Sequence, residues 1–317
     1  MGNTSRVLPF NHVDFLRMAM IVIVVLCHIV RFTEHYPWVK EGLLTLVMPC
    51  FLFVTAALVN VDKQFKDFAR YLLRILLPYI TMVLGFALLS LYLPVRGGMH
   101  ELSVSELTRV VFIDSIGPYW FLHTLVVCGA VYYLVYRGLS ACAPLPRFLV
   151  FFSLLLALAM LTPILSLRHA VYYGMGVALR QSGVRLSSLG FGSVWAMLPM
   201  LMLMIGPAHW EWLDLRLALA SVCFFLFFNG LYAKQNKDNV LFRHLCFLGR
   251  NTLPIYLFHP IFTMVGKYLS PLFAFDTTSL LHAAAVTLLS VYGSLCLAWI
   301  LDRFSLSRLW LSPGILR

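Results

Sequence analysis

An arginine and a histidine stand eleven residues apart in the first apolar run of the sequence, "RMAMIVIVVLCHIVRF" (residues 17–32). In an α-helix this spacing brings Arg17 and His28 to one face, about 16 Å apart along the axis. An ionisable residue inside a membrane span is a functional hypothesis by default. A neutral imidazole suits a general base. The alternative is that His28 packs in a bundle and bonds to a neighbouring carbonyl.

A second group of residues that suits chemistry is a basic stripe in "DKQFKDFARYLLRILLPY" (62–79). Its members are spaced by three or four and would share one helix face: Lys63, Lys66, Arg70 and Arg74. Such a stripe either reaches anionic lipid at the membrane interface or binds a phosphorylated ligand, which the arginine fork grips with two hydrogen bonds. We expect Pro78 to interrupt the start of the following span.

Aromatic residues mark a third stretch, "GPYWFLHTL" (117–125). Tyr119 and Trp120 suit the aromatic belt at a membrane interface. An exposed indole face also suits stacking on the C–H face of a sugar ring, so both interpretations stay open.

A fourth stretch, "LGRNTLPIYLFHPIF" (248–262), combines a helix start with two polar aromatic side chains. Asn251 or Thr252 is expected to cap the helix. A helix N-terminus beside Arg250 is a potential phosphate site. Tyr256 and His259 follow within the membrane, three residues apart.

Composition indicates which elements must position these residues. The chain has 317 residues, of which 61% are hydrophobic and only 12% charged, whereas soluble domains have about 45–50% apolar and about 25% charged residues. The mean hydropathy is +0.86. The seven cysteines are scattered without CxxC pairs, which is typical of reduced packing residues. The sequence therefore predicts an all-α, polytopic transmembrane bundle, and the first apolar run is expected to remain as an anchor.

Windows of about 20 residues predict about ten transmembrane helices, at 18–33, 43–60, 74–94, 118–136, 148–165, 169–180, 188–206, 214–233, 252–270 and 279–301. Most of the 24 lysines and arginines fall on the side of the two termini, so both termini are predicted to be cytoplasmic. The same bias accounts for the net charge of +11 without nucleic acid. The outer loop 95–117 and the inner loop 233–251 are each expected to hold an amphipathic segment.

Taken together, the four stretches resemble the acyltransferase-3 family of integral-membrane O-acyltransferases. The likeness rests on the basic-x10-His spacing, the arginines before a proline, "WFL" and "LGRNTLPIYLFHP", and it covers nearly the whole chain. It implies one integral-membrane acyltransferase domain over 1–317, in the short branch without an SGNH domain. It also implies a multi-pass protein of the bacterial inner membrane.

The resemblance implies roles residue by residue. His28 is the catalytic residue, either as a general base or as an acyl carrier, and Arg17 is its partner in the motif. Arg70 and Arg74 match the family's arginine pair near the donor, although the usual pair is three apart and this one is four. The remaining supporting positions are Arg250 for the donor, with Trp120, Tyr256 and His259 for the acceptor or the site's support. Glu34, above His28, either meets the acceptor or is an ordinary loop residue.

The expected reaction is transfer of an acetyl group from cytoplasmic acetyl-CoA to a sugar hydroxyl. The predicted partners are acetyl-CoA, a lipid-linked or cell-envelope glycan and membrane lipids, with no metal; a homo-oligomer stays open. A secondary transporter would show two similar halves with matched broken helices, which the sequence lacks. A polyprenyl-phosphate transferase would need clustered carboxylates for Mg²⁺, and the sequence has no DDxxD or DxD cluster. A non-catalytic subunit of a polysaccharide export machine remains an alternative, but leaves the Arg17–His28 stripe unexplained.

Overall fold

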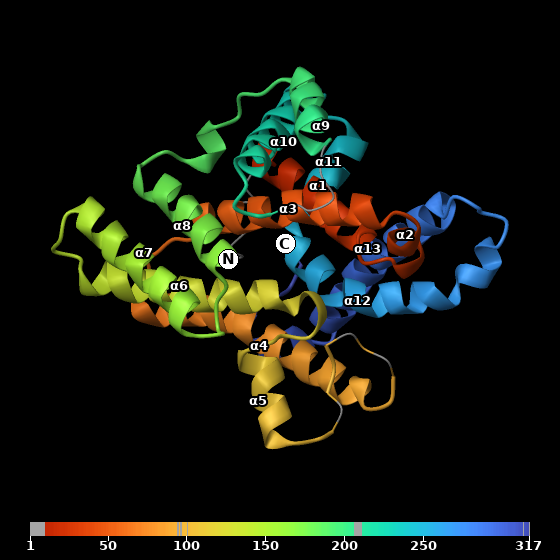
Figure 1. The fold of residues 1–317 in the computed structure, drawn as a ribbon, viewed down its shortest axis with the longest axis horizontal. Coiled ribbons are helices and arrows are strands. Elements are labelled where there is room, and N and C mark those ends of the chain that lie inside the picture. Colours follow the sequence, from red (N-terminus) through yellow and green to blue (C-terminus); the bar gives the residue numbers. More distant parts are fainter. Residues whose placement is uncertain are drawn as a thin grey trace, which may run out of the picture. The chain divides into compact units, whose positions relative to one another are not determined.

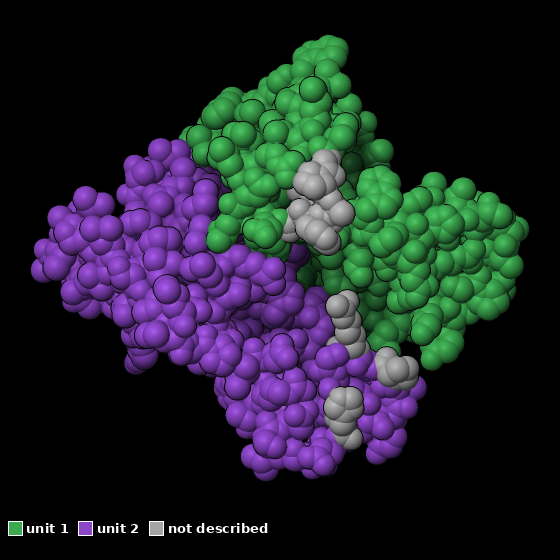
Figure 2. Space-filling model, viewed as in Figure 1, with its two compact units in different colours: residues 1–47, 187–295, 316–317 green, residues 48–186, 296–315 purple. Residues whose placement is uncertain are grey.

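The computed structural model describes residues 10–93, 95, 97–99, 101–205, 211–312 and 314–316. These residues form helices and no strands (Figure 1), which confirms the predicted all-α class. The chain divides into two compact units: unit 1 comprises residues 1–47, 187–295 and 316–317, and unit 2 comprises residues 48–186 and 296–315 (Figure 2). We describe each unit by itself.

The α-helices are α1 (His12–Leu26), α2 (Val30–His35), α3 (Pro37–Leu58), α4 (Phe65–Ser90), α5 (Val104–Phe112), α6 (Trp120–Gly138), α7 (Pro144–Leu161), α8 (Leu167–Gln181), α9 (Met197–Met204), α10 (Leu215–Lys234), α11 (Val240–Arg250), α12 (Thr252–Tyr268) and α13 (Leu280–Arg303). The part of the chain that the structure describes also contains five short 3₁₀ helices, of which the last follows α13: η1 (Gly117–Tyr119), η2 (Leu186–Ser188), η3 (Val194–Ala196), η4 (Ser270–Phe273) and η5 (Leu306–Trp310).

Among the described residues, six helical segments are long and apolar enough to cross a membrane: Pro37–Leu58, Phe65–Ser90, Gly117–Gly138, Pro144–Leu161, Leu215–Lys234 and Leu280–Arg303. The other four predicted spans fall on shorter helices. These are 18–33 on α1 and α2, 169–180 on the 15-residue α8, 188–206 on η3 and α9, and 252–270 on the 17-residue α12. The number of ten spans and the orientation of the termini stay predictions.

In unit 1, α1 packs against α10, α11 and α12. Asn11 and Asp14 form a capping box that starts α1. The Asn11 side chain accepts from the N–H groups of Val13 and Asp14, and the Asp14 side chain accepts from that of Asn11, so three backbone N–H groups at the helix start have partners. Phe15 of α1 packs with Phe242 and Cys246 of α11. A Cβ on Gly249 would lie only 1.7 Å from the carbonyl oxygen of Asp14, so glycine is what allows α11 to approach the backbone of α1.

In unit 2, α4 begins at Phe65 and continues through Pro78 to Ser90. Two expectations are therefore wrong. Lys63 precedes the helix instead of sharing its face, and Pro78 does not interrupt the span. A proline costs a transmembrane helix less when neighbouring helices and local adjustments satisfy the freed backbone groups, and Pro78 is buried. Phe68 of α4 stacks on Tyr133 of α6, with ring centroids 4.0 Å apart.

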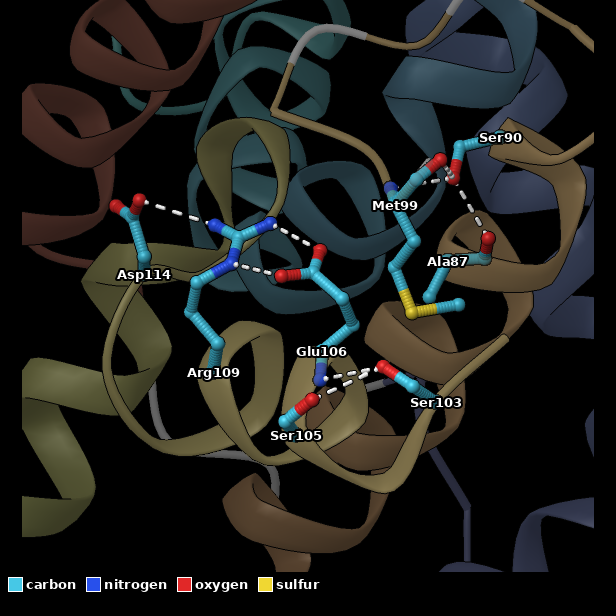
Figure 3. Close-up of polar contacts among 8 residues, drawn as sticks. All are labelled: Ala87, Ser90, Met99, Ser103, Ser105, Glu106, Arg109 and Asp114. Carbon is cyan, nitrogen blue, oxygen red and sulfur yellow. Dashed lines mark hydrogen bonds and ion pairs between the residues drawn. The ribbon is translucent and has the colours of Figure 1, made fainter. Parts of the chain in front are cut away.

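Both expected amphipathic segments are helical, α5 in the loop 95–117 and α11 in the loop 233–251. Figure 3 shows the polar contacts that hold α5. Arg109 donates two hydrogen bonds to Glu106, at 3.1 and 2.9 Å, and one to Asp114 at 3.2 Å. These bonds raise the pKa of Arg109, chiefly through the hydrogen bond to Glu106. The Ser103 hydroxyl caps the helix start.

Candidate active site

The first predicted span is not one continuous helix. α1 ends at Leu26, α2 begins at Val30, and His28 lies in the break between them. Ile29 adopts an extended backbone conformation, with φ −84° and ψ 109°, which stops α1 from continuing. The helical arithmetic that placed Arg17 and His28 on one straight face is therefore wrong beyond Leu26.

The side chain of His28 takes part in this break. Its backbone N–H bonds to the Val25 carbonyl, so the Val24 carbonyl lacks the partner that a continuing helix would supply. The His28 Nδ1 lies 2.6 Å from that Val24 oxygen and donates to it, because a carbonyl can only accept. In the neutral ring, Nε2 is then the unprotonated, basic nitrogen.

His259 on α12 has the same arrangement. Pro260 has no N–H, so it cannot bond to the Tyr256 carbonyl four residues earlier. The His259 Nδ1 donates to that carbonyl at 2.9 Å and to the Ile255 carbonyl at 3.1 Å. The side chain is fully buried, with 0% exposure. Its Nε2 is again the basic nitrogen, and it has no hydrogen-bond partner among the described residues.

The two histidines lie together in unit 1. Their ring centroids are 5.0 Å apart, in an edge-to-face arrangement, and the Tyr256 ring lies 5.8 Å from that of His259. The structure thus brings together three residues that the sequence analysis selected from opposite ends of the chain. His28 lies in the break after α1, whereas His259 lies inside the continuous α12.

Arg17 links α1 to the start of α12, where its Nη2 donates to the Thr252 hydroxyl at 2.6 Å. Asn251 takes the N-cap position of α12 without a capping side-chain bond. Its amide donates instead to the Phe247 carbonyl at 2.9 Å. The expectation that Asn251 or Thr252 caps the helix through its side chain is therefore wrong.

Arg250 is already bound within unit 1. It forms an ion pair with Asp14 at 2.9 Å, between side chains that are 15% and 11% exposed. Its guanidinium carbon lies 4.2 Å from the centre of the Phe10 ring. These contacts hold the start of α1 against the end of α11, so a phosphate would have to compete with Asp14 for this arginine.

Arg31 was not selected from the sequence, yet it fixes the far side of the break. It donates to the Ser279 hydroxyl at 3.1 Å and to the carbonyls of Ser270 and Asp276, at 3.0 and 2.6 Å. These bonds hold α2 to the turn between η4 and α13. The signal in the sequence was a basic residue three positions after His28. Glu34, on the same short helix, is exposed.

Three predicted site residues lie in unit 2. Arg70 is exposed and pairs with Asp67 at 3.2 Å. The Arg74 Nε donates to the Leu311 carbonyl at 2.8 Å. Trp120, the first residue of α6, stacks on His169 of α8 with ring centroids 4.4 Å apart and an angle of 12°. One face of the indole is therefore covered by an imidazole.

The comparison with known families covers both units. The sequence model described as "Acyltransferase domain", acyltransferase-3, matches residues 10–299 of the 317-residue chain. No curated protein and no solved structure matches the chain at a significant level. The match includes every site residue discussed above, from Arg17 to His259. The chain belongs to the acyltransferase-3 family and is a membrane acyltransferase by that membership.

Proposed function

We propose that the protein transfers an acetyl group from acetyl-CoA to a hydroxyl of a cell-envelope sugar. Family membership supports acyl transfer in a membrane. The observation that carries the proposal is the Nδ1 bond of His28 to the Val24 carbonyl, because it fixes the tautomer in which Nε2 is basic. An unprotonated nitrogen is what a general base needs to remove a proton from a hydroxyl, and in neutral His28 that nitrogen is Nε2.

The proposed chemistry uses His28 Nε2 in one of two ways. As a general base, Nε2 takes the proton of the sugar hydroxyl while the oxygen attacks the thioester carbonyl. The C–S bond then breaks, and the thiolate of coenzyme A receives the proton. As a nucleophile, Nε2 itself attacks the thioester carbonyl, and the C–S bond breaks to release the thiolate of coenzyme A. The sugar oxygen then attacks the acetyl-imidazole, the C–N bond breaks, and the hydroxyl proton passes to the thiolate. Both routes need the same nitrogen unprotonated.

His259 is proposed to support this step. Its buried Nε2 can only accept a hydrogen bond while the ring is neutral and Nδ1 is the donor. The 5.0 Å between the ring centres puts this acceptor beside His28, where a substrate hydroxyl or a protonated His28 would satisfy it. Tyr256 is proposed to support the His259 ring, and Glu34 remains a candidate contact for the acceptor.

The proposed donor contacts are arginines. Coenzyme A carries phosphates, which arginine binds with paired hydrogen bonds. Arg74 is the first candidate, since its Nε is engaged by a neutral carbonyl and not by a carboxylate. Arg70 pairs with Asp67 and Arg250 with Asp14, so each would have to exchange an ion pair for a phosphate. Arg17 is a further candidate.

The proposed location is a bacterial inner membrane. The proposed acceptor is a lipid-linked or polymeric glycan, and Trp120 is proposed to stack on its sugar ring.

The test compares glycans by mass spectrometry from cells that express the parent protein, His28→Ala or His28→Gln. We expect the acetyl mass increment on a sugar with the parent and its loss with both variants, at equal membrane abundance. The control is His244→Ala, which removes a histidine that bonds to Tyr292 at 2.9 Å and should leave acetylation intact. Acetylation that persists in both His28 variants would remove His28 from the chemistry.

A further inference from the structure

The segment that follows α13 folds back onto the arginine proposed to bind the donor. We call the described residues 305–312 and 314–315 the arm; they lie in unit 2 and contain η5, which packs against α4. The arm lies entirely after residue 299, where the family match ends. Its contacts are therefore features of this chain that family membership does not assign.

The arm contacts one face of α4 at two points. The Leu311 carbonyl accepts from Arg74 Nε at 2.8 Å, and the Trp310 indole Nε1 donates to the Thr81 hydroxyl at 3.1 Å. Arg74 and Thr81 are seven residues apart, so they lie on the same face about two turns from each other. Adjacent arm residues therefore bridge two turns of α4.

Further bonds inside unit 2 hold the arm in shape. The Ile315 N–H donates to both carboxylate oxygens of Asp302, at 2.8 and 2.9 Å. The Ser312 N–H donates to the Ser307 carbonyl at 3.3 Å, and Ser307 is 1% exposed. These hydrogen bonds therefore hold the backbone of the arm in a defined conformation.

The backbone at the contact is strained. Leu311 has φ +54° and Ser305 has φ +58°, in the left-handed region that side chains other than glycine rarely adopt. Such a conformation persists only when the surrounding structure holds it. The residue that offers its carbonyl to Arg74 is one of these two, so the strain lies at the contact with the arginine.

We propose that the arm is a positioning element for Arg74, and that it orients the guanidinium toward a phosphate of the acyl donor. With Nε–H engaged by Leu311, the remaining fork of the guanidinium is the edge formed by Nη1 and Nη2, which suits two oxygens of one phosphate. An arginine has high rotamer entropy, and a side chain ordered before binding loses less of it. This inference rests on the proposed donor role of Arg74.

The test measures binding and turnover separately, on the full chain reconstituted in lipid discs. Binding is followed with radiolabelled coenzyme A by equilibrium dialysis, and KM for acetyl-CoA and kcat are measured on the same material. Trp310→Phe keeps the aromatic ring but removes the N–H donor, and Thr81→Val removes its acceptor. Both should weaken coenzyme A binding and raise KM by roughly 2- to 12-fold, the cost of ordering one flexible side chain, with kcat unchanged. A chain ending at Phe304 should show at least the same effect.

The matched control is Trp299→Phe on α13, a tryptophan that is 58% exposed, which should leave KM and binding at parent values. Leu311→Gly keeps the carbonyl and relieves the strained φ, so it should also bind coenzyme A like the parent. In an Arg74→Ala background, Trp310→Phe should have no further effect on binding, because the arm acts through that arginine.

The two ideas fail in different ways. If Arg74→Ala weakens binding but Trp310→Phe, Thr81→Val and the shortened chain do not, the arm has no positioning role and the donor assignment stands. Additive effects of Trp310→Phe and Arg74→Ala would likewise overturn the arm's action through Arg74. If Arg74→Ala itself binds coenzyme A like the parent, the donor assignment and the inference both fall.

Discussion

At the scale of single residues, His259 combines complete burial with an unsatisfied nitrogen. A buried polar atom without a hydrogen-bond partner lowers stability by about 1–3 kcal/mol. The His259 Nε2 is such an atom, because it has no partner among the described residues. Its Nδ1 is well used, since it satisfies the carbonyl that Pro260 leaves without a helical donor. Only Nε2 therefore makes no structural hydrogen bond, and we propose that it accepts one from the substrate or from His28.

The variant His259→Phe separates these roles. It keeps an aromatic ring of similar size and removes the unsatisfied nitrogen, so we expect thermal stability within about 1 kcal/mol of the parent, as losses at Nδ1 and gains at Nε2 offset. We expect acetyl transfer to fall at least tenfold. Fluorescence-detected melting and a radiolabel transfer assay measure the two. Full activity in a stable variant would make His259 a packing residue.

For Arg250 we expect the reverse of His259: its replacement should lower stability and leave the kinetics of the folded protein unchanged. Its bond to Asp14 is mostly shielded from water, and a hydrogen bond between charged groups contributes about 1.5–3 kcal/mol. Arg250→Ala should therefore lower stability by about that amount, while the folded fraction keeps its KM for acetyl-CoA. The double variant Asp14→Ala with Arg250→Ala should lose less than the sum of the single variants. A stable Arg250→Ala protein with a raised KM would instead restore the donor role predicted from the sequence.

At the scale of elements, the α1–α11 contact holds the site together, because it brings the start of α12 to Arg17. Gly249→Ala would press a methyl group into the Asp14 carbonyl. Overpacking costs about 1–3 kcal/mol, and the obstacle here is backbone that cannot rotate away, so we expect a loss of about 3 kcal/mol in thermal unfolding. The matched control is Gly85→Ala in α4, where nothing lies within 4 Å and alanine should be neutral or mildly stabilising. Equal stability of both variants would contradict this role for Gly249.

The sequence predicted the helical class and the amphipathic helices α5 and α11, because their apolar periodicity is local. It did not predict the break at His28. Ile29 and Val30 continue the apolar run without a glycine or proline, and the break depends on a side-chain bond to Val24 that no periodicity reveals. Conversely, the break predicted at Pro78 is absent, since α4 continues through this buried proline.

Across the whole chain, contacts within each unit join residues that are distant in the sequence. The resemblance selected His28 and His259, but not the contact between their rings. The ion pair of Asp14 with Arg250 and the bond of Arg74 to Leu311 span more than 230 residues. Contacts between residues so far apart in the sequence depend on the fold. The sequence therefore indicated Arg250 and Arg74 as candidates but could not predict their partners. It missed Arg31 for the same reason.

We propose that acetyl groups pass from acetyl-CoA inside the cell to a glycan, through His28. It is tested most directly with radiolabelled acetyl-CoA added to inverted membrane vesicles and to right-side-out spheroplasts, with label counted in the extracted glycan. We predict labelled glycan from inverted vesicles that carry the parent protein. We predict none from spheroplasts, and none from inverted vesicles that carry His28→Ala at equal abundance. Label incorporated from outside intact spheroplasts, or label that persists with His28→Ala, would overturn this proposal.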